Sequence, residues 1–204
     1  MTGLPARVRE NEDGFTLVEL VVATAILGII LLAVGGLMFS TTTTQRSVSA
    51  VNDASSSAQT AADGLRTQLR NAAGFRLTTV DGHDQLLVAR VASTGTPTTY
   101  TCRAWYFARD ERELRTTTWP APRSTALPTR PDQVSTWALL LRDVSPRPAS
   151  TAVFGSPTLP SAPVEVVGGT LEIAFEVASD DRNKPTAIKF TATSGGAQGG
   201  VSTC

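Results

Sequence analysis

The chain has 204 residues, which is enough for one globular domain and an accessory segment. Its 18 basic residues balance its 18 acidic residues, so a global basic field built to bind nucleic acid is excluded. A single histidine, His83, and two cysteines, Cys102 and Cys204, without a C-x-x-C pair argue against a zinc site. We therefore expect neither a metal nor a cofactor.

Residues 1–14 form a polar segment that precedes a long apolar run. The segment contains arginines as well as acidic residues. The positive-inside rule therefore gives only weak support for a cytoplasmic location of this segment. The apolar run covers residues 15–39, and between residues 20 and 39 its only polar side chain is Thr24. A helix of this length spans the roughly 30 Å hydrocarbon core of a bilayer. We predict that residues 15–39 form the membrane-spanning half of a helix.

Two ordinary explanations of this run fit less well. A secretory signal peptide has a shorter apolar region followed by a small-x-small cleavage site, and the sequence after Met38 shows no such site. A plain membrane anchor fits the length but leaves Glu19 unexplained. A carboxylate inside an apolar segment is costly, so it is a functional hypothesis by default.

Residues 14–23, GFTLVELVVA, resemble the leader-cleavage motif of the type IV prepilin superfamily. The resemblance implies that a prepilin peptidase cuts between Gly14 and Phe15 at the cytoplasmic face and N-methylates Phe15. It also implies that Glu19 pairs with the new amino group of a neighbouring subunit during assembly. An unpaired carboxylate is costly in a low-dielectric environment, whereas a paired one is not. The pairing of Glu19 with this amino group would therefore favour the correct axial register between neighbouring subunits. The partners implied are the peptidase, other pilin or pseudopilin subunits, an inner-membrane assembly platform and membrane lipid.

The helix is expected to continue beyond the membrane, because no proline occurs between Phe15 and Gly95. Apolar residues at alternating three- and four-residue steps predict an amphipathic half over residues 40–74, with Gly74 as the helix end. The threonine run 41–44 is poor helix material and predicts a flexible joint. Gly28, Gly35 and Gly36 suit either close helix packing, which we favour, or local unwinding, as in related major pilins. The apolar steps fall at Val48, Val51, Ala54, Ala58, Ala61, Leu65, Leu69 and Ala72.

Strand-forming residues dominate from Phe75 onward, and residues 75–193 are predicted to form an extracytoplasmic β-rich domain. The proline-rich stretch 119–163 is expected to be mostly loop, with residues 137–141 as a short apolar insert, and residues 194–204 are expected to form a flexible tail. The predicted fold is α+β and pilin-like: a long N-terminal helix packed on an antiparallel sheet. In an oxidising compartment Cys102 and Cys204 would form a disulfide; two unpaired thiols are the alternative. The predicted strands are residues 86–92, 98–107, 114–118, 164–167, 170–178 and 186–193.

No arrangement of residues in this domain predicts catalysis. The cluster of Asp81, His83 and Asp84 is typical of a polar turn, and no nucleophile accompanies it. Asp180, Asp181 and Asn183 lack the spacing of a calcium loop and predict a solvated turn. The aromatic residues Trp105, Tyr106 and Trp119 are assigned to the core or an interface, since no basic cluster beside them supports stacking on DNA.

The leading interpretation is a structural minor pilin or pseudopilin, not an enzyme, that serves a type IV pilus, a type II secretion pseudopilus or a competence filament. It would cross the cell membrane once, with its C-terminal domain outside the cytoplasm, before entering the pilus or pseudopilus. The segments TTYTCRAWYF and ELRTTTW resemble the hairpin of the J-type or W-type minor subunits. One alternative is a membrane-tethered adhesin or DNA-uptake receptor with a pilin-type leader, for which nucleic acid is a further partner. Another is a plain bitopic protein.

Overall fold

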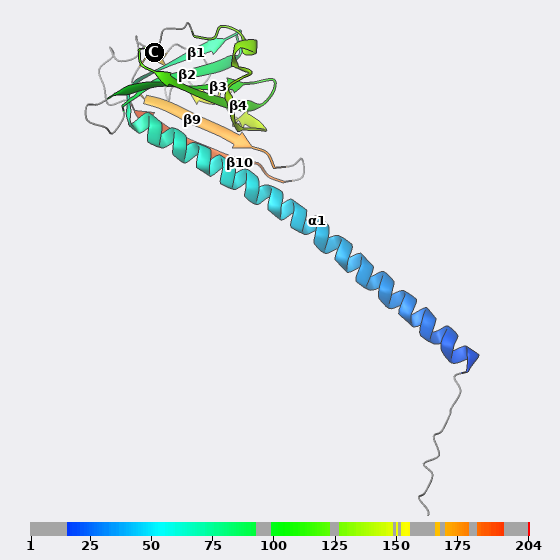
Figure 1. Ribbon diagram of the computed structural model, residues 1–204. Coiled ribbons are helices and arrows are strands. Elements are labelled where there is room, and N and C mark those ends of the chain that lie inside the picture. Colours follow the sequence, from blue (N-terminus) through cyan, green and yellow to red (C-terminus); the bar gives the residue numbers. More distant parts are fainter. Residues whose placement is uncertain are drawn as a thin grey trace, which may run out of the picture. The chain divides into compact units, whose positions relative to one another are not determined.

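The computed structural model describes residues 16–92, 99–122, 127–148, 150, 152–155, 166–167, 170–179, 183–193 and 204. The chain divides into two compact units, Met1–Arg46 and Ser47–Cys204. Helix α1 (Leu17–Arg70) supplies the described residues of the first unit after Thr16 and the beginning of the second unit (Figure 1). The predicted leader, residues 1–14, lies outside the described residues.

In the second unit, α1 packs one apolar stripe against the sheets. The three- and four-residue spacing of its buried side chains is the spacing of one helix face. Residues 47–70 lie alongside β10 (Thr186–Thr193), and Phe190 of that strand belongs to the same core as the helix stripe (Figure 1). The buried helix residues are Ala58, Ala61, Ala62, Leu65 and Leu69.

The helix ends at Arg70, so the prediction that it ends at Gly74 is wrong. The next residue, Asn71, still donates its N–H to the carbonyls of Thr67 and Gln68, while its own carbonyl accepts from Ala92. Strand pairing then begins at once, and Gly74 lies within β1 (Ala72–Val80) beside an irregularity in register. Sheet pairing therefore overrides the glycine as a stop signal, and the β domain begins a few residues earlier than predicted.

The threonine run 41–44 is helical rather than a break in the helix. Each hydroxyl donates to a backbone carbonyl three or four residues earlier, so each side chain has its hydrogen-bond partner within the helix. The low helix propensity of threonine therefore does not interrupt α1 at this run. The bonds run from Thr41 to Leu37 O, Thr42 to Met38 O, Thr43 to Ser40 O and Thr44 to Ser40 O, at 2.8–3.0 Å.

Two antiparallel sheets complete the second unit. The larger one has the strand order β5-β4-β3-β2-β1-β8, and the smaller one has the order β10-β9-β6 with β7 also paired to β9. Beyond β1 and β10, the strands are β2 (Asp84–Ala92), β3 (Tyr100–Ala108), β4 (Glu113–Pro120), β5 (Ala138–Leu141), β6 (Val144–Pro146), β7 (Phe154–Gly155), β8 (Val166–Val167) and β9 (Thr170–Val177). A 3-10 turn, η1 (Pro131–Val134), precedes β5.

The larger sheet buries apolar side chains on both faces. Leu87, Trp105 and Phe107 point into the main core, which they share with the α1 stripe and with Phe175 of β9. On the opposite face, Leu86 and Tyr106 join a second cluster that the 127–137 segment covers. The α+β architecture with a long N-terminal helix on antiparallel sheet is thereby confirmed.

The stretch 119–163 contains more regular structure than its prolines suggest. Pro120 is the last residue of β4, Pro131 the first of η1 and Pro146 the last of β6. Proline is tolerated at such ends because the ring removes only a donor that the element does not use. The prediction of mostly loop therefore missed β5, β6 and β7, whereas the predicted strand 186–193 coincides with β10.

Candidate assembly and processing site

Helix α1 has a defined start next to the predicted processing site. Thr16 precedes the helix, and its Oγ1 accepts a hydrogen bond from the backbone N–H of Glu19 at 3.3 Å. The Thr16 carbonyl accepts from the N–H groups of Glu19 and Leu20. A threonine in this place is an N-cap, which satisfies donors that the first turn leaves without a partner. The predicted processing residues Gly14 and Phe15 lie outside the described residues.

Glu19 lies in the first turn of α1, and its side chain is exposed. A carboxylate there is favoured by the positive end of the helix dipole. Within residues 16–46 the only basic residue is Arg46, which is about 40 Å away along a helix of 1.5 Å rise per residue. No cation of that described stretch can therefore reach the Glu19 carboxylate. The assembly role of Glu19 remains a prediction.

The helix segment that follows is apolar on every side. An 18-residue window reaches a mean hydropathy of 2.8, and none of that window is buried within the structure. Leu32 is 79% exposed and Phe39 76% exposed. A helix of a soluble domain normally shows one apolar stripe, while an all-round apolar helix is covered by lipid or by other helices. By length and composition, α1 can cross a membrane.

The comparison with family models decides the class of this helix. Residues 9–35 match the model described as the prokaryotic N-terminal methylation motif. The N-terminal region of the chain is type IV prepilin-like. The match covers the junction between Gly14 and Phe15, Glu19 and most of the apolar run. No curated protein and no solved structure matches the chain.

This assignment fixes the general role of the N-terminal region. The motif implies processing by a prepilin peptidase and assembly with other pilins. Proteins of the prepilin-like family are structural subunits rather than enzymes. The long apolar helix fits anchoring of the prepilin-like chain in a membrane before assembly.

The glycines of the apolar segment are not required by contacts within the chain. A Cβ atom added to Gly28, Gly35 or Gly36 would meet nothing within 4 Å. Glycine at these positions is compatible with close approach of a neighbouring helix or with a local change of helix conformation. Close packing and local unwinding both remain predictions.

The cluster of Asp81, His83 and Asp84 in the globular unit forms a turn and the strand start that follows it. Asp81 and Gly82 have positive φ angles of 51° and 80°, which close the hairpin between β1 and β2. Asp84 is only 2% exposed: one carboxylate oxygen accepts from the Tyr106 hydroxyl and the other from the N–H of Arg109 at 2.9 Å. Burial raises the pKa of Tyr106, and its hydrogen bond to Asp84 raises that pKa further.

These contacts give the cluster a structural role. The His83 Nε2 atom lies 3.6 Å from Asp84 and 3.5 Å from Asp110, so the β1–β2 turn meets the β3–β4 turn. Both oxygens of Asp84 already accept hydrogen bonds from Tyr106 and Arg109. In the described part of the chain, no group of three His, Cys, Asp or Glu residues is placed to hold a metal.

Gln85 is a structural residue that the sequence did not reveal. Its side chain is 6% exposed and bridges β2 to a distant segment. The amide oxygen accepts from the N–H groups of Val153 and Phe154, and the amide nitrogen donates to Phe154 O at 2.7 Å. The only sequence signal for this role is that Gln85 is a polar residue within an apolar strand. That signal does not identify its hydrogen-bond partner, which is 69 residues away in the chain.

A disulfide joins Cys102 of β3 to Cys204, with the two Cα atoms 5.6 Å apart. Cys102 is fully buried, and Cys204 packs against the second cluster together with Trp119 and Trp137. Trp119 and Trp137 have ring centroids 6.1 Å apart. The bond therefore fastens the end of the chain to the outer face of the larger sheet. The predicted tail, residues 194–203, lies outside the described residues.

The remaining candidate residues that the structure describes belong to the core clusters or hold segments of the fold together. Trp105 belongs to the main core, while Tyr106 and Trp119 belong to the second cluster. Asn183 donates its amide to the Ser47 hydroxyl at 2.7 Å, which ties the approach to β10 to the helix. Asp180 and Asp181, considered with Asn183 as oxygen ligands, lie outside the described residues.

Proposed function

We propose that the chain is a minor pilin or pseudopilin that is cut after Gly14, N-methylated on Phe15 and assembled into a filament. The observation that carries the proposal is the methylation motif at residues 9–35, which includes the start of a helix whose apolar window is not buried within the structure. The motif explains why a polar leader precedes the helix and why an acidic residue, Glu19, lies in its apolar segment. Assembly accounts for the apolar side chains, because neighbouring subunit helices cover them once the chain leaves the membrane.

The globular unit lies outside the cytoplasm before assembly in this proposal. A disulfide between Cys102 and Cys204 supports that placement, because such bonds persist in oxidising compartments and are rare in the cytosol. The unit would then face the periplasm or cell exterior while α1 crosses the membrane once. The filament is a type IV pilus, a type II secretion pseudopilus or a competence filament.

A minor position in the filament is favoured by the form of the globular unit. It carries a six-stranded sheet with several short additional strands and proline-bounded connections. Such a unit suits an end of the filament, where neighbours crowd it less. The resemblance of residues 98–107 and 113–119 to the hairpin of J-type or W-type minor subunits fits the β3–β4 hairpin.

Filament incorporation of Glu19 variants tests the proposal. The full chain is produced with its peptidase and assembly machinery, and the amount recovered with sheared filaments is compared with the amount left in the membrane. Glu19→Ala should lower incorporation about tenfold or more, because the amino group of the neighbour loses its carboxylate. Asp53→Ala removes an exposed acid from the same helix and should incorporate normally. Equal incorporation of both variants would contradict the role of Glu19.

A further inference from the structure

Helix α1 begins close to the bond that the prepilin motif marks for cleavage. Only two residues, the second of them Thr16, separate Gly14 from Leu17, the first residue of the helix. The Thr16 carbonyl accepts from the N–H groups of Glu19 and Leu20, at 3.0 and 3.2 Å, and Thr16 Oγ1 accepts from the N–H of Glu19 at 3.3 Å. The side chain that caps α1 is therefore a near neighbour in sequence of the bond to be cut.

The sequence around Thr16 carries two further signals of a helix start. Thr16 and Glu19 have the T-x-x-E spacing of a capping box, a pattern in which the first residue caps the helix that the glutamate belongs to. Phe15 and Leu20 occupy the two apolar positions of a hydrophobic staple, one directly before the cap and one four residues after it. Both signals place the start of the helix after the cleavage bond, and α1 does begin at Leu17.

A competing start lies on the other side of the cleavage bond. Asp13 directly precedes Gly14, and aspartate is preferred over threonine as an N-cap. A helix capped by Asp13 would place Gly14, Phe15 and Thr16 in its first turn. Gly14 opposes that start, because glycine weakens a helix. The Thr16 cap opposes it too, because it supplies the side-chain acceptor for a start after the bond.

The two starts differ in their consequences for the bond between Gly14 and Phe15. In the cleavage, water adds to the carbonyl carbon of Gly14, the C–N bond to Phe15 breaks, and the new amino group takes up a proton. The attack requires a defined geometry at that carbon. In a helix capped by Asp13, the Gly14 carbonyl would accept from the N–H of Val18, and the backbone would curl around the bond. A start after the bond would let the backbone lie extended in a peptidase active site.

We propose that Thr16 is a positioning residue for leader cleavage: its cap keeps the bond between Gly14 and Phe15 outside α1, where the prepilin peptidase can bind it. The inference rests on the proposed function, in which this bond is cut. Thr16 acts through the helix start rather than on the reacting atoms. Only chains with the later start bind productively, so a shift to the Asp13 start weakens apparent binding and leaves the chemistry of the bound chain unchanged.

Cleavage kinetics of the full chain in detergent, with purified prepilin peptidase, test this role. Thr16→Ala removes the cap and introduces a strong helix former, so it should favour the Asp13 start about tenfold. KM should rise about threefold or more while kcat stays unchanged. Thr16→Ser keeps a hydroxyl acceptor and should behave as the wild type. A wild-type KM for Thr16→Ala, or a defect in kcat alone, would overturn the proposal.

The double variant Thr16→Ala/Asp13→Ala separates an effect on the helix start from a direct contact between Thr16 and the peptidase. It lacks the competing cap as well, so its KM should return to within about twofold of the wild type. Asp13→Ala alone should be cleaved with wild-type kinetics, because the Thr16 cap is intact. A double variant with the same defect as Thr16→Ala would show that the peptidase contacts the threonine directly, and this would overturn the proposal.

NMR chemical shifts measure the helix start without the peptidase. In the full chain in detergent, isotope-labelled at Phe15, the Cα shift of this residue should move toward helical values in Thr16→Ala and return in the double variant. An unchanged shift in Thr16→Ala would overturn the proposal whatever the kinetics. Normal cleavage of the wild type together with unaltered kinetics of Thr16→Ala contradicts the role of Thr16 alone. A wild-type chain that the peptidase leaves uncut contradicts the proposed function and overturns this inference with it.

Discussion

Leucine side chains are exposed in one stretch of helix α1 and buried in the other. In the first unit, residues 17–39 of α1 are apolar all round, and Leu32 is 79% exposed. In the second unit, residues 47–70 bury one stripe, and Leu65 is 1% exposed. The stripe is explained by the core of this chain, whereas the all-round apolar surface is explained only by lipid or other subunits. The comparison separates the part that folds from the part that assembles.

The largest expected effect comes from exchanging leucine for alanine in each stretch. Leu65→Ala should lower the free energy of unfolding of the globular unit by about 2.5–5 kcal/mol, because it leaves a cavity in the main core. Leu32→Ala should change that free energy by less than about 0.5 kcal/mol. Urea unfolding of the full chain in detergent, followed by tryptophan fluorescence, measures both. Similar losses in the two variants would break the distinction between the stretches.

Reduction of the disulfide should have the next largest effect, and only on the second unit. The bond between Cys102 and Cys204 spans 102 residues of sequence, so reduction should lower the free energy of unfolding by about 2–5 kcal/mol. Urea unfolding with and without a reductant gives the difference. The double variant Cys102→Ser/Cys204→Ser serves as the control and should not respond to the reductant. An identical midpoint for the oxidised and reduced wild type would contradict the expectation.

A smaller effect on the free energy of unfolding is expected from the titration of Tyr106, which belongs to the second cluster. The raised pKa of Tyr106 keeps its hydroxyl neutral in the folded state, while an unfolded tyrosine loses its proton near pH 10. The unfolded state therefore binds fewer protons above about pH 10, and stability should fall as pH rises from there.

The measurement for Tyr106 is the pH dependence of unfolding in wild type and in Tyr106→Phe. At neutral pH, Tyr106→Phe should cost about 1–3 kcal/mol, because Asp84 loses one of its hydrogen-bond donors in a buried place. Above pH 10 the variant should lose less stability than the wild type. Parallel pH profiles for the two proteins would show that Tyr106 does not titrate as described.

The sequence predicted the parts of this protein that depend on local pattern. The motif at residues 14–23, the apolar run and the spacing of Ala58, Ala61 and Leu65 specify the class and the helix face. The predicted strand at residues 186–193 has the bounds of β10. Each of these signals lies within a few consecutive turns of helix or residues of strand, so no distant partner is needed to interpret it.

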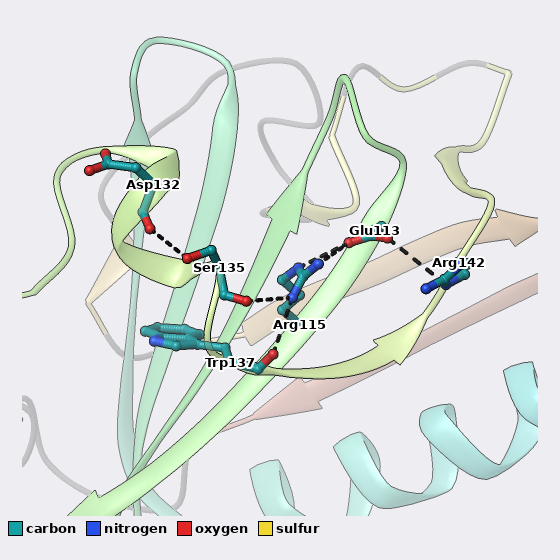
Figure 2. A network of polar contacts seen from close by, with 6 residues as sticks. All are labelled: Glu113, Arg115, Asp132, Ser135, Trp137 and Arg142. Atoms are coloured by element: carbon teal, nitrogen blue, oxygen red, sulfur yellow. Dashed lines mark hydrogen bonds and ion pairs between the residues drawn. The ribbon is translucent and has the colours of Figure 1, made fainter.

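The features that were missed depend on partners far away in the chain. The helix ends before Gly74 because Ala72 already pairs with Val91 of β2. Strand β5 exists because β4 provides a ladder for a short apolar segment within a proline-rich stretch. The Arg115 side chain donates to two backbone carbonyls just before this strand, 20 and 22 residues along the chain (Figure 2). Pairings of this range are set by tertiary structure, and a single sequence carries no local mark of them.

The measurement that tests the central claim most directly is the intact mass and N-terminal sequence of the chain, produced with and without a prepilin peptidase. The account predicts that the peptidase removes Met1–Gly14 and leaves a chain beginning with N-methylated Phe15. A Gly14→Val variant should stay uncleaved, since the narrow peptidase site would have to accommodate a side chain. An unchanged N-terminus of the wild type under both conditions would contradict the account and leave a membrane-anchored β domain without a role in a filament.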